Sequence, residues 1–310
     1  MSIQVFRLSN CVGDEVAILD WGARLCSWST RLGSGKRNIV LGYQDILKYQ
    51  QDPYYLGAVV GPYANRIGHG KLKIASRTYQ LEQNEGNHHL HGGVSGLHHV
   101  RWQYCHSTRS QLSLRYLQQD GVGGYPGPVN YKLEFELEDC SRLWVRMQAE
   151  VGQISLVGPT FHPYFNLAAD TISINDHYLQ LDAEHFAVVD DAGIPTGELR
   201  NVKDSQFDFR CARVLADTAV DHNFVVGGSL KQSAASLISP DQHLKLAISA
   251  DYPGLQLYTG DYLSTPFTPR QGLCLEPQFF PDSPNQIGFP FHFSQPDKPF
   301  EATLCYQLDK

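Results

Sequence analysis

Apolar and polar residues alternate with a period of two wherever a pattern can be recognised in this chain. The clearest segments are residues 112–116, 131–137, 143–151, 244–248 and 304–308. Because successive side chains of a β-strand point to opposite faces, this alternation is typical of antiparallel strands with one buried and one exposed face. Turn-forming pairs separate such segments, as at Asp120–Gly121 and Pro253–Gly254.

Helical signals are nearly absent, and residues 43–51 are the stretch that could form a short helix. No linker or shift in composition marks a domain boundary, and no repeat of fixed length favours a propeller. The sequence therefore predicts one all-β domain over residues 1–310, with two large antiparallel sheets packed face to face, long loops and few short helices.

Composition and charge exclude several classes of function. The chain is 42% apolar and 18% charged, which favours a sizeable core, and its net charge of −7 argues against binding nucleic acid. The N-terminus lacks the features of a secretory signal, and no apolar run approaches the ~20 residues of a membrane span. Seven scattered cysteines without a C-x-x-C pair indicate reduced thiols, so we expect a cytoplasmic protein.

The stretch from Gly272 to Gln286 carries the first candidate for catalysis. Glu276 follows the apolar run 273–275, which indicates the end of a buried strand. A carboxyl group that leaves water has a raised pKa, as a general base working near neutrality requires. The alternative is a glutamate at a strand end whose partners are an arginine or backbone N–H groups.

A second candidate lies in the segment 160–167, TFHPYFNL. His162 stands among Phe161, Tyr164 and Phe165, and the following proline restricts the local backbone. A histidine that these rings partly desolvate is expected to titrate close to neutrality, which suits a general acid. The alternative is a buried histidine that bonds a backbone carbonyl.

Several polar residues are candidates for binding a ligand. Arg66 follows Asn65 near the apolar pair 59–60, and a fixed guanidinium fork suits a polyhydroxylated or anionic ligand. Arg66 could equally tie two loops together through backbone carbonyls. Asp221 begins an apolar run and could accept sugar hydroxyls or cap a turn, and Gln256 could line a cavity if its strand turned it inward.

The motif 87–93, NHHLHGG, raises the question of a metal site. In an extended segment His89 and His91 would share one face, as in a cupin-like metal enzyme. The sequence offers no obvious carboxylate partner for them, no H-x-x-x-H helix and no C-x-x-C pair. A histidine before two glycines is better explained as a donor that lines a cavity where the backbone comes close.

Taken together and in this order, these motifs resemble the aldose 1-epimerase family, the galactose mutarotases. The matching segments are 19–28, 61–67, 90–93, the region of Trp102, 160–167, 193–198, 207–210, 220–224, 254–260 and 275–286. The motifs around His162 and Glu276 are the most specific of them. The resemblance implies the large antiparallel β-supersandwich fold of that family.

The resemblance also implies roles for single residues. Glu276 is expected to be the catalytic base and His162 the acid, opening the sugar ring so that α and β anomers of a free hexose such as galactose or glucose interconvert. The residues expected to bind the sugar are Asn65, Arg66, His91, Tyr164, Asp221 and Gln256. The family implies a monosaccharide substrate and neither a metal nor an organic cofactor. The expected assembly is a monomer or a homodimer.

Two positions depart from the family pattern. Pro62 stands where many members have an arginine, and Pro163 stands where serine or valine is common, so both bear on how the substrate is seated. Two other functions stay open: a sister enzyme acting on a hexose 6-phosphate, and a sugar-binding protein without catalysis.

Overall fold

The computed structural model describes residues 2–168 and 173–310. Its largest sheet has nine strands in the order β10-β11-β12-β13-β25-β22-β21-β16-β19. Their bounds are Gln103–Ser107, Gln111–Gln118, Val129–Leu137, Arg142–Val151, Phe300–Asp309, Lys245–Ala250, Ala235–Ile238, Tyr178–Leu181 and Arg213–Val214. All neighbours pair antiparallel, and the C-terminal strand β25 lies in the middle, between β13 and β22.

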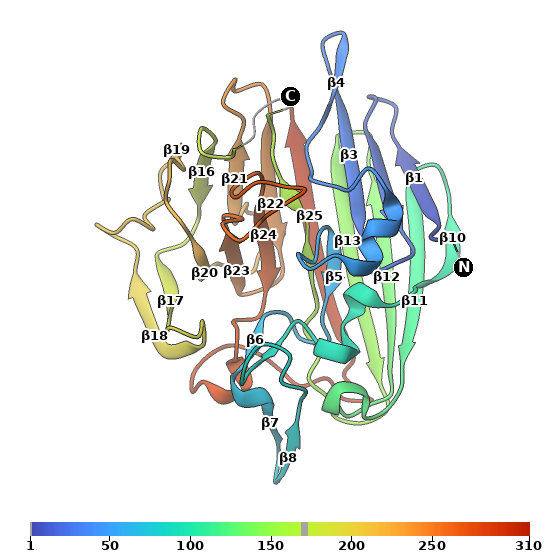
Figure 1. The fold of residues 1–310 in the computed structure, drawn as a ribbon, viewed down its shortest axis with the longest axis vertical. Helices are drawn as coiled ribbons and strands as arrows, with labels where there is room; N and C mark the ends of the chain where they lie inside the picture. The colour runs from blue at the N-terminus through green and yellow to red at the C-terminus, as the bar shows by residue number, and fades with distance from the viewer. Residues whose placement is uncertain (1, 169–172) are drawn as a thin grey trace.

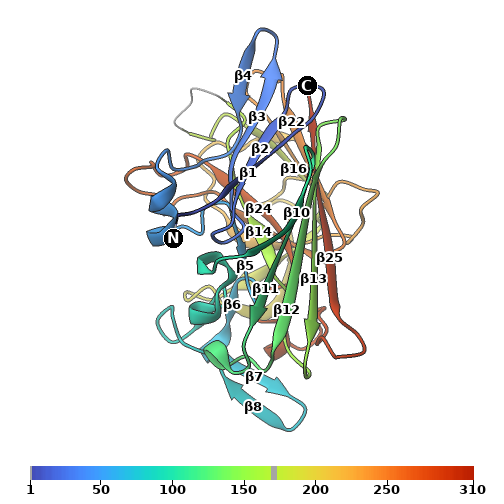
Figure 2. The same cartoon turned by 90° about the vertical axis from the view of Figure 1, so that its right-hand side faces the viewer.

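Further sheets lie against this one (Figure 1, Figure 2). A six-stranded sheet has the order β15-β24-β23-β20-β17-β18, with bounds Tyr164–Phe165, Leu273–Gln278, Gly254–Tyr258, Asp221–Val225, His185–Val189 and Pro195–Asn201. Strands β1 to β4 form an N-terminal sheet over Val5–Ser9, Glu15–Leu19, Leu25–Leu32 and Gly35–Asn38. Figure 1 shows this blue sheet beside the green strands β11 to β13, and β1 contacts β11 and β12. The architecture is the all-β, layered antiparallel arrangement that the sequence predicted.

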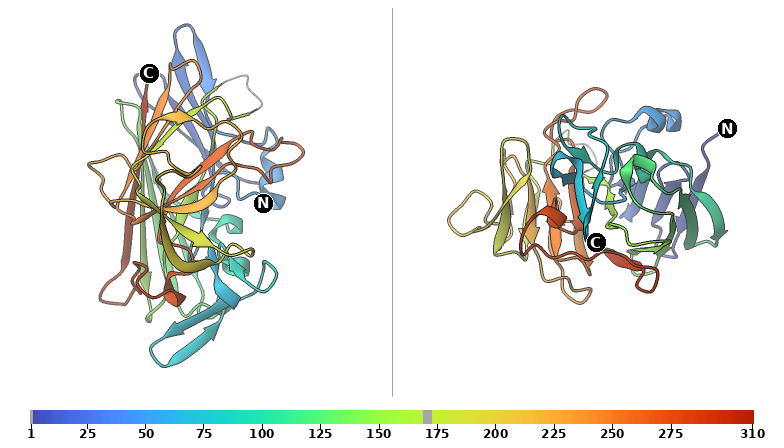
Figure 3. Two further views of the ribbon diagram at one scale, coloured as in Figure 1. Left: turned by 90° about the vertical axis from the view of Figure 1, so that its left-hand side faces the viewer. Right: turned by 90° about the horizontal axis from the view of Figure 1, so that it is seen from below.

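Short pairs and 3-10 turns complete the described chain. The pairs are β5 (Ala58–Val60) with β14 (Thr160–His162), β6 (Arg66–Ile67) with β9 (His89–Leu90), and β7 (Lys71–Ile74) with β8 (Arg77–Gln80). The last pair forms a hairpin that projects from one end of the molecule (Figure 3). The 3-10 helices are η1 Ile46–Gln51, η2 Gly68–Gly70, η3 Gly93–Ser95, η4 Leu97–His99, η5 Val122–Gly124 and η6 Ser283–Asn285. The short helix predicted within residues 43–51 is therefore confirmed as η1. No helix among the described residues is long and apolar enough to cross a membrane.

The predicted alternation is confirmed in the strands where it was clearest. In β12 the odd-numbered residues from Val129 to Leu137 are buried, while the residues between them are exposed or half-buried. Strands β13 and β25 bury their apolar residues in the same way. One hydrophobic cluster contains side chains from several sheets, for example Leu8 of β1, Val145 of β13 and Leu275 of β24.

Strand β24 differs because all six of its residues are buried. One face carries Leu273 and Leu275, which belong to the main hydrophobic cluster, and the other face carries Cys274, Glu276 and Gln278. The strand continues through Pro277 to Gln278, so Glu276 does not lie at the strand end, as predicted, but inside the strand. A central position with both faces covered holds the carboxyl group more rigidly than a strand end would.

Candidate active site

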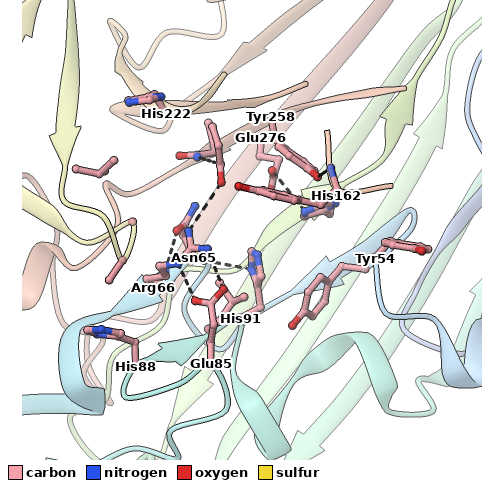
Figure 4. Close-up of a pocket in the computed structure, with 18 of the residues that line it drawn as sticks. Tyr54, Asn65, Arg66, Glu85, His88, His91, His162, His222, Tyr258 and Glu276 are labelled. Carbon is pink, nitrogen blue, oxygen red and sulfur yellow. Dashed lines mark hydrogen bonds and ion pairs between the residues drawn. The ribbon is translucent and has the colours of Figure 1, made fainter. Parts of the chain in front are cut away.

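All eight residues that the sequence singled out line one cavity of about 780 Å³. They come from separate elements: Glu276 from β24, Gln256 from β23, Asp221 from β20, and the others from the N-terminal half of the chain and β14–β15. Figure 4 shows the labelled side chains of His162, Glu276, Asn65, Arg66 and His91 gathered around it. The fold therefore brings together residues that are up to 211 positions apart in sequence, from Asn65 to Glu276.

Glu276 and His162 face each other at the base of the cavity. The distance from His162 Nε2 to Glu276 Oε1 is 3.6 Å, and the side chains are 6% and 2% exposed. His162 ends β14, which pairs with β5, and Glu276 stands opposite Gln256 in the β23–β24 ladder. The second carboxylate oxygen, Oε2, is buried and has no protein partner among the described residues. This leaves a polar atom available to a ligand.

Burial shifts the pKa values of this pair in opposite directions. Desolvation, and secondarily the charge of Asp221, raises the pKa of Glu276 well above its ordinary value. Desolvation lowers the pKa of His162 to about 4, against the opposing effects of a backbone hydrogen bond and, less strongly, of the Asp52 charge. The expectation that His162 titrates close to neutrality was wrong, because the ring is almost completely buried rather than partly desolvated. Both shifts favour the uncharged forms, and two groups this close titrate as one pair.

Arg66 forms one wall of the cavity and is held by a glutamate. Its Nε and Nη2 atoms donate to Glu85 Oε2 and Oε1 at 2.7 and 2.9 Å, and Nη1 lies 4.0 Å from Asp221 Oδ2. The side chain thus contacts carboxylates rather than the backbone carbonyls of the alternative interpretation. Asp221 in turn accepts a hydrogen bond of 2.6 Å from Gln256 Nε2. Gln256 is buried and points inward, as a cavity residue requires.

His91 and Asn65 are fixed by each other. Asn65 has a φ of 66° and His91 a φ of 49°, both in the left-handed region that few side chains adopt. The backbone N–H of Asn65 donates to His91 Nδ1 at 3.2 Å. Because burial lowers the pKa of His91 well below its ordinary value, the ring is neutral and its hydrogen is left on Nε2. His91 can therefore donate one hydrogen bond to a ligand.

His89 does not join His91. Its Nδ1 lies 2.7 Å from the carbonyl of Glu82 and its Nε2 lies 2.8 Å from the Tyr125 hydroxyl, so both ring nitrogens have protein partners. The positive φ of His91 breaks the extended geometry in which the two histidines would share a face. The cupin-like interpretation is not supported by this arrangement.

One cluster has the composition of a metal site. The ligand atoms of His162, Cys274 and Glu276 lie within 4.8 Å of one another. However, the thiol contacts Nδ1 of the imidazole and the carboxyl group faces Nε2. One ion coordinates one nitrogen of a given ring, so this arrangement does not direct three ligands at a common point.

Several residues at the site were not singled out from the sequence, among them Glu85, Tyr55 and Cys274. Glu85 lies in a polar turn before the histidine motif, and only its partner Arg66 reveals its place. Tyr55, with a φ of 56°, packs its ring 4.7 Å from that of His91 and 5.9 Å from that of His162. Cys274 stood in the apolar run before Glu276, where nothing distinguished it from a core residue.

Comparisons with known proteins agree with this geometry. A family model described as aldose 1-epimerase matches residues 4–307. The aldose 1-epimerase of Escherichia coli (strain K12) is 33% identical over 328 aligned residues, covering 98% of this chain and 95% of that protein. The galactose mutarotase of Homo sapiens is 32% identical over 312 residues, covering 95% and 91%. The crystal structure of an aldose epimerase homologue from C. elegans superposes with a TM-score of 0.95 at 26% identity, covering 99% of both chains. The chain therefore belongs to the aldose 1-epimerase family.

Proposed function

We propose that this protein is an aldose 1-epimerase, a cofactor-independent isomerase that interconverts the α and β anomers of a free hexose such as galactose or glucose. The observation that supports it best is the buried pair of His162 and Glu276 at the base of a polar cavity. The names of the relatives, aldose 1-epimerase and galactose mutarotase, support the same reaction.

Ring opening requires one proton to leave the anomeric hydroxyl and another to reach the ring oxygen. In the proposed mechanism the Glu276 carboxylate removes the first, and the His162 imidazolium donates the second from Nε2 while the bond from C1 to the ring oxygen breaks. This leaves an open-chain aldehyde, a protonated Glu276 and a neutral His162.

Closure reverses these steps on the other face of the carbonyl. After rotation about the C1–C2 bond, the hydroxyl on C5 attacks the aldehyde, His162 takes the hydroxyl proton and Glu276 returns its own to the new anomeric oxygen. The pair begins and ends with the same single proton, so the cycle consumes no reagent. Two titratable groups with opposite pKa shifts are suited to exchanging roles in this way.

The other residues are proposed to hold the sugar. Arg66 and His91 supply N–H donors, Asp221 supplies an acceptor, and Gln256 and Asn65 supply amide groups that can do either. Tyr164 packs 5.2 Å from the ring of His162 and donates its hydroxyl to the carbonyl of Tyr54 at 3.1 Å. It thereby supports the acid as well as lining the cavity.

The charges of the cavity favour a neutral sugar over a hexose 6-phosphate. Arg66 is the one lysine or arginine among the residues described as lining the cavity, and Glu85 already binds it bidentately. Besides Glu276, the cavity is lined by the carboxylates of Glu85, Asp190, Asp191 and Asp221. A phosphate dianion would meet more negative than positive charge there. A non-catalytic binding protein would have no use for a buried ionisable pair, whose desolvation is unfavourable.

Polarimetry tests the proposal. Freshly dissolved α-D-galactose and α-D-glucose are followed with wild type, Glu276→Gln and His162→Asn. Wild type should accelerate the approach to the anomeric equilibrium, and each variant should lose most of that acceleration, since each removes one proton-transfer group. No acceleration of either sugar by wild type, or full activity in Glu276→Gln, would contradict the proposal. Activity on glucose 6-phosphate alone would favour the sister enzyme.

Three further properties stay predictions. The chain is proposed to form a single domain over residues 1–310, to act in the cytoplasm, and to be a monomer or a homodimer.

A further inference from the structure

A buried thiol contacts the ring nitrogen of His162 that the reaction does not use. Cys274 Sγ lies 3.4 Å from His162 Nδ1, within hydrogen-bonding distance for sulfur. Cys274 is 0% exposed and stands two positions before Glu276, on the same face of β24. The imidazole is therefore held between two side chains of one strand, the thiol at Nδ1 and the carboxyl group at Nε2.

The thiol retains its hydrogen at neutral pH. Burial raises the pKa of Cys274 well above its ordinary value, and the nearby Glu276 acts in the same direction. A protonated thiol can donate one hydrogen bond and can also accept one at sulfur. Its sulfur can therefore accept a hydrogen bond from the Nδ1–H group of the imidazole.

We propose that Cys274 is a positioning residue for the reaction, setting the tautomer of His162 and accompanying the movement of its proton. This inference rests on the proposed function. When His162 is neutral, Nδ1–H donates to the sulfur, which leaves the lone pair of Nε2, facing Glu276 and the sugar, free to take a proton. When His162 is an imidazolium, the same Nδ1–H bond to the sulfur remains, and Nε2–H carries the proton that His162 donates. Cys274 itself does not exchange a proton with the sugar.

A thiol suits this position better than a carboxylate. A carboxylate at Nδ1 would stabilise the imidazolium strongly and favour one protonation state. Mutarotation needs the proton to move to and from His162 in each cycle. A neutral, polarisable partner fixes the ring while leaving the two states closer in energy.

The surroundings of His162 offer no substitute for this contact. The titratable and charged groups that face or influence the ring are Tyr55, His91, His98, Tyr164, Cys274, Glu276, Asp52 and Arg24. Among the described residues, Cys274 is the side chain whose hydrogen bond to Nδ1 the structure shows. Removing the thiol should therefore take away the side-chain partner of Nδ1 and make both neutral tautomers accessible.

The test compares four variants with wild type. Cys274→Ala and Cys274→Val remove the thiol, the second while refilling its volume, and Cys274→Ser keeps a group that can donate and accept. Cys305→Ala is the matched control, because Cys305 is another buried cysteine and does not line the cavity. The readouts are kcat and KM for galactose by polarimetry, their dependence on pH, and the ¹⁵N NMR shifts of His162, assigned by comparison with His162→Asn.

We expect Cys274→Ala and Cys274→Val to lower kcat about tenfold, the order of effect expected from losing one positioning hydrogen bond, with KM within about twofold. Cys274→Ser should recover most of this loss, and Cys305→Ala should match wild type. The NMR shifts should report the Nδ1–H tautomer in wild type and a mixture in the two variants that lack the thiol.

Unchanged kcat in either thiol-free variant, or an unchanged His162 tautomer in both, would overturn the inference. Those outcomes require an active wild type. An inactive wild type is instead the failure of the proposed function, so the two failures are distinguishable.

Discussion

Glu85→Gln tests how Arg66, the arginine proposed to bind the sugar, is oriented. Glu85 binds Arg66 with two hydrogen bonds of 2.7 and 2.9 Å, a bidentate geometry that fixes the guanidinium plane. Nη1 then remains directed toward the cavity and Asp221. A glutamine has nearly the same shape, but it lacks the charge and can accept only one of the two hydrogen bonds.

The magnitude follows from the exposure of the two side chains. Arg66 is 19% exposed and Glu85 is 37% exposed, so solvent screens the pair and its contribution is about 0.5–1 kcal/mol. A free energy of that size corresponds to a change of about two- to fivefold. Because Glu85 touches neither Glu276 nor His162, the change should appear as a higher KM for galactose with kcat nearly unchanged.

Initial rates of mutarotation over a range of fresh α-D-galactose concentrations measure both constants. Glu198→Gln is the matched control. Glu198 accepts two hydrogen bonds from Arg200, at 2.9 and 3.2 Å, and Arg200 does not line the cavity. A fall in KM would refute the reasoning, because it would mean that Glu85 competes with the sugar for Arg66. An equal effect in Glu198→Gln would also refute it, because the change could not then be assigned to the cavity.

Three further predictions concern charge and stability. Glu276→Gln should be inactive but should unfold less easily than wild type at pH 8. Because the pKa of Glu276 is raised in the folded protein, the free energy of unfolding of wild type falls as pH rises above 4.5, the pKa of the unfolded chain, and the uncharged amide avoids that fall. A gain of about 1–2 kcal/mol, or about 2–4 °C per kcal/mol in thermal denaturation, is expected, and an unchanged Tm would contradict it. His162→Asn should flatten the pH dependence of stability between pH 6.5 and 4. A histidine whose pKa falls from 6.5 to about 4 on folding lowers the free energy of unfolding by about 3 kcal/mol as pH drops through that window. Denaturation at several pH values measures this dependence, and a slope equal to that of wild type would count against a buried neutral ring. Asp221→Asn should move the pH profile of kcat/KM to lower pH, because the Asp221 charge raises the pKa of Glu276; a profile that stays in place or moves upward would exclude that coupling.

The strands and the residues of the site were largely predictable from the sequence, for different reasons. Alternation in β12 and β13 reports local geometry, so it needs no knowledge of partners. Glu276, His162 and Arg66 could be selected because each stands in a motif that resembles a family. What could not be predicted depends on pairing across the chain: β14 joins β5, and β15 joins β24, which brings Cys274 to His162.

The degree of burial was also beyond the sequence. Alternation indicates which face of a strand is covered, but the complete desolvation of His162 and Glu276 requires loops and sheets that converge from distant segments. For the same reason the bond between Arg66 and Glu85 had no signature, because a glutamate in a polar turn is usually exposed. Local patterns therefore located the candidate residues, while tertiary packing determined their protonation and their partners.

The opposite pKa shifts of the pair have a consequence for the direction of catalysis. Burial favours neutral Glu276 and neutral His162, which together are the state from which the proposed mechanism closes an open-chain sugar. In that mechanism ring opening begins instead from the carboxylate and the imidazolium, so a proton must first pass from Glu276 to His162 Nε2 across the 3.6 Å that separates them. A sugar bound as proposed would place hydroxyl dipoles beside Oε2, which has no partner among the described residues, and the sulfur of Cys274 can accept Nδ1–H. Both interactions stabilise the charged form, so substrate binding itself should bring the two protonation states toward equal energy, as a reaction that runs in both directions requires.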